Sequence, residues 1–394
     1  MAGEMSHGRQ WLILTGLALG VCVTNGFARF AYGLVLPAMK AQLGWSYAQS
    51  GWLNTANALG YVAGALLTMA LIRRLSPSRL FSAGAVLTAL ALLATGFDEA
   101  MWAQTLWRVA AGLFGALSFV TGGALAAALF PGDGRRNALA IALYFGGGGG
   151  LGIVLAGAGV PLMLEQWSGE SWRWAWIGIG LLSLAICPVA VWAAEQLRVP
   201  RAKAPAPVRL PLRRMLGEIG GYAGFGLGYI VYLTFLSAWM TERDFGAGTI
   251  ALTWMLLGSC ITLSPFVWRG VFARFASGVP LAMILTGIAA GSSLPVLWPS
   301  TAGLIVSSMV FGICVFMAPG AVTSFARQNL APEAWGPAIS FFTLVFAVSQ
   351  TLGPVGAGLI GDLAGGIGTS LLVAAGLLLT GAVCALLQRP LETG

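Results

Sequence analysis

Long apolar runs, separated by short polar loops, follow one another from residue 11 to residue 387. A helix needs about 20 predominantly apolar residues to cross the hydrocarbon core of a bilayer. By that rule the sequence predicts an all-α membrane protein with twelve transmembrane helices. The predicted spans cover residues 11–39, 48–72, 78–97, 101–130, 137–164, 172–194, 215–241, 248–268, 277–297, 300–326, 335–361 and 366–387.

One longer polar stretch, residues 196–214, divides the predicted spans into two groups of six. This stretch is basic and rich in proline, which is typical of a partly extended linker. We therefore expect an N-terminal six-helix bundle over residues 1–195 and a C-terminal six-helix bundle over residues 215–394. Residues 196–214 would connect them as a cytoplasmic linker.

The two halves of the sequence resemble each other at a nearly constant offset. Residues 26–32 match residues 226–232, and Gly112 matches Gly312. One further residue of shift aligns glycine-rich segments of the fifth and eleventh predicted spans. Each match is short, but the agreement across three pairs of helices indicates a parallel internal repeat.

Composition indicates that lipid surrounds most of the chain. Hydrophobic residues make up 58% of the sequence and charged residues only 9%, whereas a soluble domain carries about 25% charged residues. Such a chain cannot cover itself with a water-soluble surface. The five cysteines fall within apolar runs without paired spacing. They support neither a disulfide nor a metal site, and we expect no cofactor.

The distribution of positive charge predicts the orientation in the membrane. The chain has 21 Lys and Arg residues and a formal net charge of +8. If the N-terminus is cytoplasmic and the loops alternate, most of these residues fall in cytoplasmic loops, as the positive-inside rule requires. We therefore expect a monomeric, multi-pass protein of the bacterial inner (cytoplasmic) membrane, N-in/C-in. Charge spread over short loops also argues against nucleic acid as a partner.

Three local patterns resemble the major facilitator superfamily. Arg108, Gly112 and Gly115 are similar to its helix 4 motif, in which packing glycines follow an arginine. Residues 146–150 resemble its glycine-rich helix 5 motif, and residues 349–354 resemble the counterpart in helix 11. The resemblance implies the major facilitator fold, in which two six-helix bundles enclose a central cavity lined mostly by helices 1, 4, 7 and 10.

Two stretches are similar to a narrower group, the YbfB/YjiJ family. They are residues 26–32 in the first span and residues 226–230 in the seventh. One motif departs from the superfamily pattern, because Thr68 stands where the loop after helix 2 usually carries an aspartate. The resemblance therefore does not extend to the charged latch that this motif forms between the bundles.

Two arginines, Arg29 and Arg108, lie within predicted spans at similar depth in the outer half of the bilayer. An arginine near mid-membrane costs about 2.5–3.5 kcal/mol, so each must face a cavity or a partner. No Asp or Glu lies near the middle of any predicted span. Arginine binds carboxylate and phosphate oxygens through paired N–H groups, and we expect both residues to bind an anionic solute. The alternative is that Arg108 braces helix 4 and Arg29 caps a neighbouring helix.

Polar side chains at similar depth complete the predicted binding set. Hydroxyl and amide groups that converge on a cavity would orient a ligand. Hydrogen bonding between helices is the alternative for each of them. The predicted substrate-binding residues are Arg29, Arg108, Asn25, Tyr32, Asn57, Tyr229, Tyr232 and Gln350.

Glycine-rich positions within the spans are the predicted packing and gating points. In water a glycine disfavours a helix by about 1 kcal/mol relative to alanine, but in a bilayer the helix persists because its backbone must stay hydrogen-bonded. We expect close helix packing here, with local bending as the bundles rock. The residues are Gly112, Gly146, Gly150, Gly157, Gly353 and Pro354.

The function expected from these features is secondary active transport. The protein would move a small organic anion across the membrane by alternating access. A proton is a candidate coupling ion, carried by the solute or by an acid at a rim such as Glu218 or Asp362. An enzyme would need a nucleophile, an acid–base pair or a metal cluster at depth, and the sequence contains none.

Two other functions remain open at this point. One is an efflux pump for hydrophobic or toxic compounds, in which the arginines are structural. The other is a membrane sensor that does not transport, although a sensor usually carries an extra soluble domain.

Overall fold

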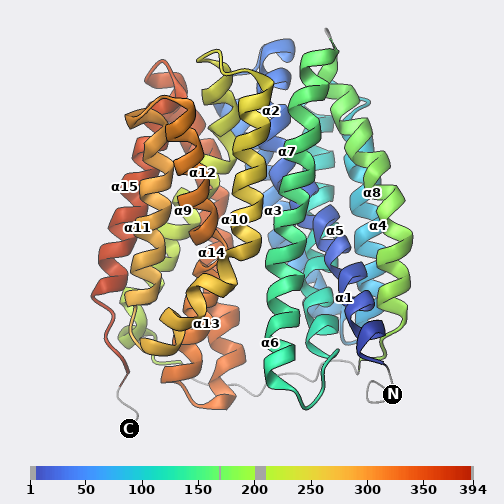
Figure 1. Ribbon diagram of the computed structural model, residues 1–394, viewed down its shortest axis with the longest axis vertical. Coiled ribbons are helices and arrows are strands. Elements are labelled where there is room, and N and C mark those ends of the chain that lie inside the picture. The colour runs from blue at the N-terminus through green and yellow to red at the C-terminus, as the bar shows by residue number, and fades with distance from the viewer. Residues whose placement is uncertain (1–5, 168–169, 200–209, 392–394) are drawn as a thin grey trace. The chain divides into compact units, whose positions relative to one another are not determined.

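The computed structural model describes residues 6–167, 170–199 and 210–391, which form helices and turns without any strand (Figure 1). The first half of the chain contains α1 (His7–Val21), η2 (Cys22–Phe30), α2 (Ala31–Leu43), α3 (Tyr47–Leu71), α4 (Pro77–Thr95), α5 (Met101–Ala127), α6 (Gly134–Ala142), η3 (Leu143–Gly147), α7 (Gly148–Gln166) and α8 (Ser171–Glu195). The second half contains η4 (Leu212–Met215), α9 (Leu216–Thr241), α10 (Ala247–Arg274), α11 (Val279–Leu297), α12 (Thr301–Val315), α13 (Ala318–Asn329), α14 (Pro332–Leu363) and α15 (Ile367–Leu386). The segments η2 and η3 are π-helices, and η4 is a 3-10 helix.

Each predicted span coincides with one helix or with consecutive helices. Among the described residues, eleven helical segments are long and apolar enough to cross a membrane. The helix α3 is not one of them, although its 25 residues extend over about 37 Å at 1.5 Å per residue. Its apolarity is lowered by Asn54 and Asn57. Twelve spans and the N-in/C-in orientation therefore stay predictions.

The chain divides into two compact units. Unit 1 comprises Met1–Trp45, Ala56–Lys203 and Met240–Thr262, and unit 2 comprises Ser46–Thr55, Ala204–Trp239 and Leu263–Gly394. The units follow the two halves of the sequence except in α3, the last two residues of α9, and α10. The linker predicted over residues 196–214 stays a prediction, because residues 200–209 lie outside the described residues.

In unit 1, α4 packs against α5 and α8, and the π-helix η2 packs against α5 and α7. One end of this unit contains a core of buried side chains that includes Leu17, Phe81 and Tyr144. These residues come from three different predicted spans, so the apolar surfaces that join them are buried against each other and not against lipid.

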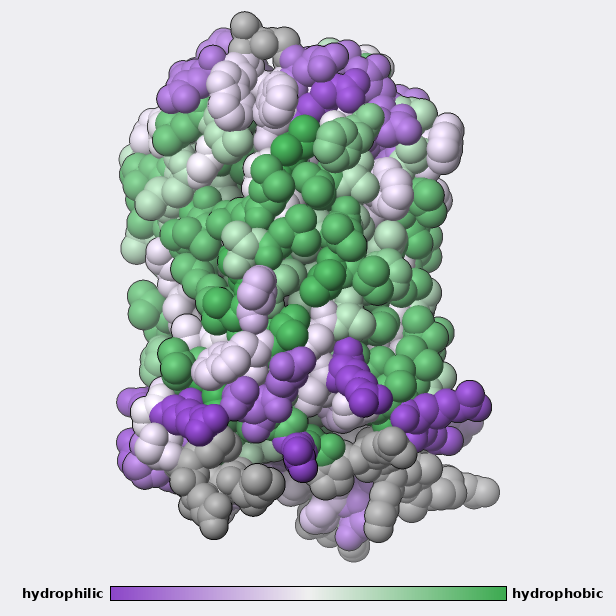
Figure 2. All heavy atoms as spheres, turned by 90° about the vertical axis from the view of Figure 1, so that its right-hand side faces the viewer, coloured by the Kyte–Doolittle hydropathy of each residue, from purple (hydrophilic) through white to green (hydrophobic). Residues whose placement is uncertain are grey.

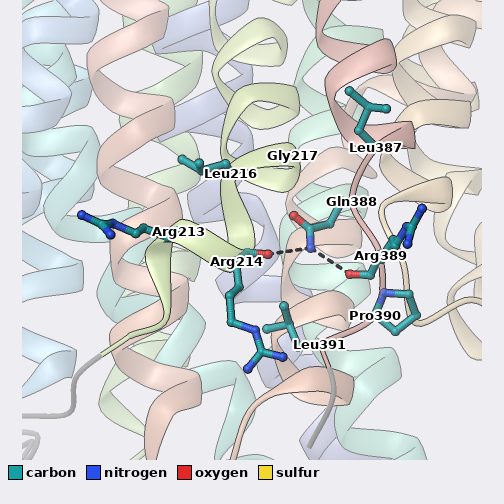
Figure 3. A pocket seen from close by; sticks show the side chains of 9 residues that line it. All are labelled: Arg213, Arg214, Leu216, Gly217, Leu387, Gln388, Arg389, Pro390 and Leu391. Carbon is teal, nitrogen blue, oxygen red and sulfur yellow. Dashed lines mark hydrogen bonds between the residues drawn. The ribbon is translucent and has the colours of Figure 1, made fainter.

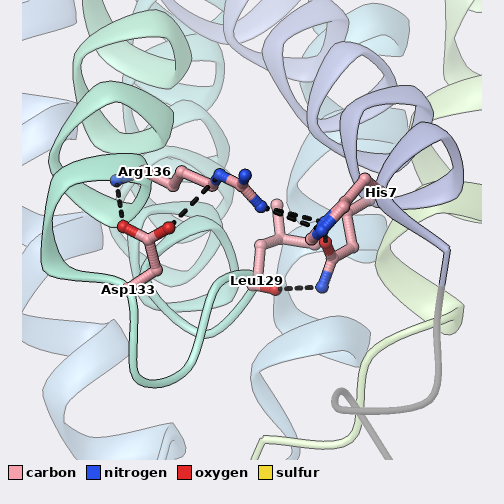
Figure 4. Close-up of polar contacts among 5 residues, drawn as sticks. His7, Leu129, Asp133 and Arg136 are labelled. Carbon is pink, nitrogen blue, oxygen red and sulfur yellow. Dashed lines mark hydrogen bonds and ion pairs between the residues drawn. The ribbon is translucent and has the colours of Figure 1, made fainter.

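A polar cluster ties the start of α1 to the turn between α5 and α6 (Figure 4). Arg136 Nη1 lies 3.0 Å from His7 Nε2, and Arg136 Nε lies 3.2 Å from Asp133 Oδ2. Gln10 Nε2 donates a hydrogen bond of 2.9 Å to the carbonyl of Leu129. Asp133 also caps α6, since its Oδ1 accepts a hydrogen bond from the backbone N–H of Arg136.

In unit 2, α11 packs against α12 and α15, and α14 packs against α13 and α15. The far end of α14 also holds the start of α3. The two carboxylate oxygens of Asp362 accept hydrogen bonds from the backbone N–H groups of Tyr47 (2.8 Å) and Ala48 (2.9 Å). A carboxylate suits this place because the first N–H groups of a helix lack partners within the helix and carry partial positive charge.

The surface of unit 1 over α4 and α8 is apolar. Figure 2 shows hydrophobic side chains in a broad band between hydrophilic ends. Large residues such as Leu90, Leu181 and Val189 are about half exposed. Such a continuous apolar surface would be unstable in water and suits the hydrocarbon core of a bilayer.

Candidate functional site

The first predicted span is not a regular α-helix. Between α1 and α2 it winds as the π-helix η2, whose nine residues are all buried and include Arg29. A π-helix replaces the usual i to i−4 hydrogen bonds by longer ones, and such segments are frequent at functional sites. Gly26 permits the close approach of α7 here, because a Cβ on Gly26 would lie 2.6 Å from the Cα of Gly152.

Arg108 of α5 holds the backbone of this π-helix. Its Nη1 donates a hydrogen bond of 2.7 Å to the carbonyl of Ala28, the residue before Arg29. The amide of Asn57 on α3 donates to the carbonyls of Arg108 (3.1 Å) and Ala28 (3.5 Å). The guanidinium of Arg108 lies 4.7 Å from the ring centroid of Tyr32, and only 1% of this arginine is exposed. These contacts are those expected if Arg108 braces the helices, which is the alternative to solute binding.

Arg29 lies among aromatic rings. Its guanidinium carbon is 5.3 Å from the ring centroid of Tyr61 and 5.9 Å from that of Phe30, which is within the range of cation–π attraction. Only 7% of Arg29 is exposed. A ring attracts the face of a guanidinium, whereas carboxylate and phosphate oxygens bind along its N–H edge. The aromatic contacts are therefore compatible with anion binding.

Asn25 lies one turn before Arg29 in the same π-helix. Its side chain is 8% exposed and makes no hydrogen bond with any residue of the described chain. A buried amide normally has a hydrogen-bond partner. Asn25 and Arg29 thus lie one turn apart in η2, and their binding of a solute stays a prediction.

Of the three predicted residues in unit 2, two are hydrogen-bonded to each other. The hydroxyl of Tyr229 donates a hydrogen bond of 3.1 Å to Oε1 of Gln350 on α14. Tyr232 instead shares a hydrogen bond of 2.7 Å with Ser307 and stacks on Phe311 at 4.1 Å between ring centroids. Tyr232 is fully buried in this arrangement, so its contacts are those of a residue that joins α9 to α12.

The structure adds aromatic residues that the predicted set lacks. In unit 1 these include Tyr61, which follows Asn57 by four residues and so shares its helix face. In unit 2, Phe225 stacks on Tyr229 at 4.5 Å, and Phe346 lies 5.6 Å from the same ring. The spacing of four residues on α9 could have indicated Phe225, but no sequence signal connects Phe346 to it.

The predicted glycines lie where helices of one unit meet closely. A Cβ on Gly112 would lie 2.0 Å from the carbonyl oxygen of Asn57, so only glycine fits there. The corresponding distances are 2.3 Å to Thr262 for Gly150, 2.7 Å to Trp254 for Gly157 and 2.5 Å to Leu227 for Gly353. Gly146 is buried in η3, and Pro354 lies inside α14. Close packing is thus observed at Gly112, Gly150, Gly157 and Gly353, while gating stays a prediction.

The halves of the internal repeat differ at the candidate site. Arg29 in the first half corresponds to Tyr229 in the second. The first lies in a π-helix and the second in the uninterrupted α-helix α9. Charge and backbone irregularity therefore belong to the first half alone at this position.

Comparison with protein families decides what kind of protein this is. A family model described as "Uncharacterised MFS-type transporter YbfB" matches residues 21–386. The chain belongs to the major facilitator superfamily, among its YbfB-type transporters. This confirms the resemblance read from residues 26–32 and 226–230. As a superfamily member, the protein is a multi-pass membrane transporter and not an enzyme.

Solved structures of superfamily members share the fold. A bacterial homologue of the human lysosomal transporter Spinster, inward-facing and occupied, has a TM-score of 0.71 and 16% sequence identity, over 97% of both chains. A variant of the nucleoside transporter NupG has a TM-score of 0.73 and 15% identity, over 96% of this chain and 99% of that one. Identities this low carry the fold alone. A search of curated proteins finds no match.

Proposed function

We propose that this transporter moves a small organic anion across the bacterial inner membrane by alternating access, driven by a solute or proton gradient. The observation that carries the proposal is Arg29, a buried arginine within a predicted membrane span. Its π-helical backbone is held by a hydrogen bond from Arg108 on another helix, α5. Intramembrane charges are costly, and by default they mark a site of function.

The arrangement around Arg29 supports the binding of an anion. Asn25 offers an amide from the same π-helix, and Tyr61 and Phe30 supply ring faces beside the guanidinium. Arg108 acts as a positioning residue, because it bonds the carbonyl of Ala28 and so fixes the backbone that carries Arg29. The described Asp and Glu residues lie at helix ends or in turns and not in the middle of a span. They therefore do not compete with a solute for the positive charge of Arg29.

Two acids at helix ends, Asp362 and Glu218, are the candidates to couple proton movement to solute transport. Both carboxylate oxygens of Asp362 accept hydrogen bonds from the start of α3. Glu218 is 1% exposed, near the start of α9. We keep the proton as a candidate coupling ion, and a dependence of solute accumulation on an imposed pH gradient across proteoliposomes tests it.

We also propose α3 as the twelfth span, with both termini in the cytoplasm. Its length exceeds the hydrocarbon thickness of ~30 Å, and its asparagines can be tolerated because Asn57 bonds backbone carbonyls of α5 and η2. Single cysteines test the orientation in a cysteine-free background. A membrane-impermeant thiol reagent added outside should label Asp98→Cys and spare Arg74→Cys, and the reverse would overturn it.

A thermal-shift screen of the purified protein tests the choice of substrate class. The panel contains small carboxylates, sulfonates, phosphates and lipophilic cations. We expect at least one anion to raise the melting temperature of the native protein and not that of Arg29→Gln. A panel in which only lipophilic cations stabilise the protein would contradict the proposal.

That second outcome would favour efflux of hydrophobic compounds. One observation supports this candidate: unit 2 contains a stack of aromatic rings from α9 and α14, in which Phe225 contacts both Tyr229 and Phe346. Such a stack suits planar apolar ligands.

A further inference from the structure

A cavity of about 420 Å³ lies in unit 2 where η4 and the start of α9 meet the residues that follow α15 (Figure 3). None of its lining residues belongs to the candidate anion site or to the aromatic stack. Its lining includes three arginines and three leucines: Arg213, Arg214, Arg389, Leu216, Leu387 and Leu391.

The charged side chains in the described lining of this cavity are all positive. No Asp or Glu is among its described lining residues, and none of its three arginines pairs with a carboxylate in the described chain. The acid closest in sequence to Arg214 is Glu218, which is buried and has its Oε2 beside Gly278 instead. An anion that enters the cavity would therefore meet three guanidinium groups and none of the described carboxylates.

The side chain of Gln388 holds the backbone of the cavity lining in place. Its Nε2 donates hydrogen bonds to the carbonyls of Arg214 (2.9 Å) and Arg389 (2.8 Å), and its Oε1 accepts one of 3.2 Å from the N–H of Glu218. Figure 3 shows Arg214 and Arg389 on either side of this amide. The backbones of both arginines are thus held by one side chain, before any ligand arrives.

The segment after α15 is fixed a second time. The N–H of Leu391 donates a hydrogen bond of 2.7 Å to Oδ1 of Asn329, whose amide donates to the carbonyl of Ala276. Gly217 allows α9 to approach α15, because a Cβ there would lie 2.8 Å from the carbonyl of Cys384. Preorganisation of this kind lowers the entropic cost of binding.

The position of the cavity indicates what kind of anion it meets. The helix α9 begins at Leu216 and α15 ends at Leu386, so the arginines lie where two spans leave the apolar band. Leu216 is 63% exposed and Leu387 is 74% exposed, although leucine is costly to expose to water. At the end of a membrane span, such leucines face acyl chains while arginines reach phosphates.

We propose that this cavity binds the headgroup phosphate of an anionic phospholipid, with the guanidinium groups of Arg214 and Arg389 as ligands and the exposed leucines against its acyl chains. Guanidinium groups bind phosphate oxygens through paired N–H groups. A zwitterionic lipid has the same phosphate, but its own amine offsets the charge. Free phosphate can bind the same guanidinium groups, but it has no acyl chain that could contact the exposed leucines.

Thermal unfolding of the full-length protein in detergent tests this site. The ligands are phosphatidylglycerol, cardiolipin, phosphatidylcholine and inorganic phosphate. We expect the two anionic lipids to raise the melting temperature of the native protein, and Arg214→Gln/Arg389→Gln to lose more than half of that rise. The matched control is Arg73→Gln/Arg74→Gln, an exposed pair in unit 1, which should keep the full rise.

Native mass spectrometry gives a second measurement, which does not depend on the stability of the variant. The native protein and the control should retain an anionic lipid that Arg389→Gln alone retains less. An equal rise with inorganic phosphate would overturn the lipid assignment. Equal retention or stabilisation in the cavity variants and the control would overturn the site itself.

Discussion

At the scale of single residues, the two intramembrane arginines differ in what they contact. Arg108 has 1% exposure and donates to the carbonyl of Ala28, while the guanidinium of Arg29 lies near the rings of Phe30 and Tyr61. The sequence predicts both arginines as site residues because both are charges in a span. Bracing by Arg108 is the alternative that the sequence leaves open, but the sequence does not identify the acceptor, because this is the carbonyl of Ala28 in a π-helix that hydropathy does not predict.

Replacement of Arg108 by methionine tests the bracing role. The change removes the donor to Ala28 and keeps much of the apolar volume, so the protein should lose about 1–3 kcal/mol of stability, the cost of an unsatisfied buried acceptor. Thermal unfolding measures this against Arg74→Met, an exposed arginine. A variant that unfolds like the native protein but no longer binds the anion would instead make Arg108 a direct ligand.

Two tyrosines on α9 form a matched pair for a second prediction. Tyr232→Phe removes a hydroxyl that bonds Ser307 in the core of unit 2, so it should cost about 0.5–1.5 kcal/mol of stability without changing solute binding. Tyr229→Phe removes the donor to Gln350 and should weaken binding of the solute more than it lowers stability. Thermal shifts with and without the solute separate the two effects. Equal losses of solute binding and of stability in both variants would contradict the assignment of Tyr229 to binding and of Tyr232 to helix packing.

At the scale of helices, apolar length predicts most of the fold. A run of about 20 apolar residues in a bilayer must satisfy its backbone internally, so it becomes a helix. Hydropathy does not distinguish a π-helix from an α-helix, because the side chains are the same. The sequence therefore predicts the first and fifth spans but not the π-helices η2 and η3 inside them. Nor does it predict that the start of α3 packs within unit 2.

The cap that Asp362 places on α3 gives a prediction at this scale. Asp362→Ala leaves the N–H groups of Tyr47 and Ala48 without their carboxylate, and the loss of a helix cap costs about 0.5–2 kcal/mol. Asp362→Asn keeps an oxygen acceptor and should lose less. Glu333→Ala is the control, since Glu333 is an exposed acid on the same helix. Equal melting temperatures for Asp362→Ala and the control would show that the cap contributes nothing.

At the scale of the whole molecule, the family match establishes a transporter but leaves the solute open. The superfamily fold supports many substrates, so similarity to solved structures does not select one. The candidate chemistry of this chain is local: an arginine and an asparagine lie on a π-helix in the first half, and a tyrosine–glutamine pair lies in the second. Function must therefore be tested at these residues.

Uptake of a labelled anion into proteoliposomes tests the central claim most directly. The solute is the carboxylate, sulfonate or phosphate that gives the largest thermal shift, and the proteins are the native chain, Arg29→Gln and the exposed control Arg74→Gln. Hydrogen bonds to charged groups contribute about 1.5–3 kcal/mol, so Arg29→Gln should lower the affinity for transport roughly 10- to 100-fold. The control should transport at the native rate. Native transport by Arg29→Gln would contradict the anion site.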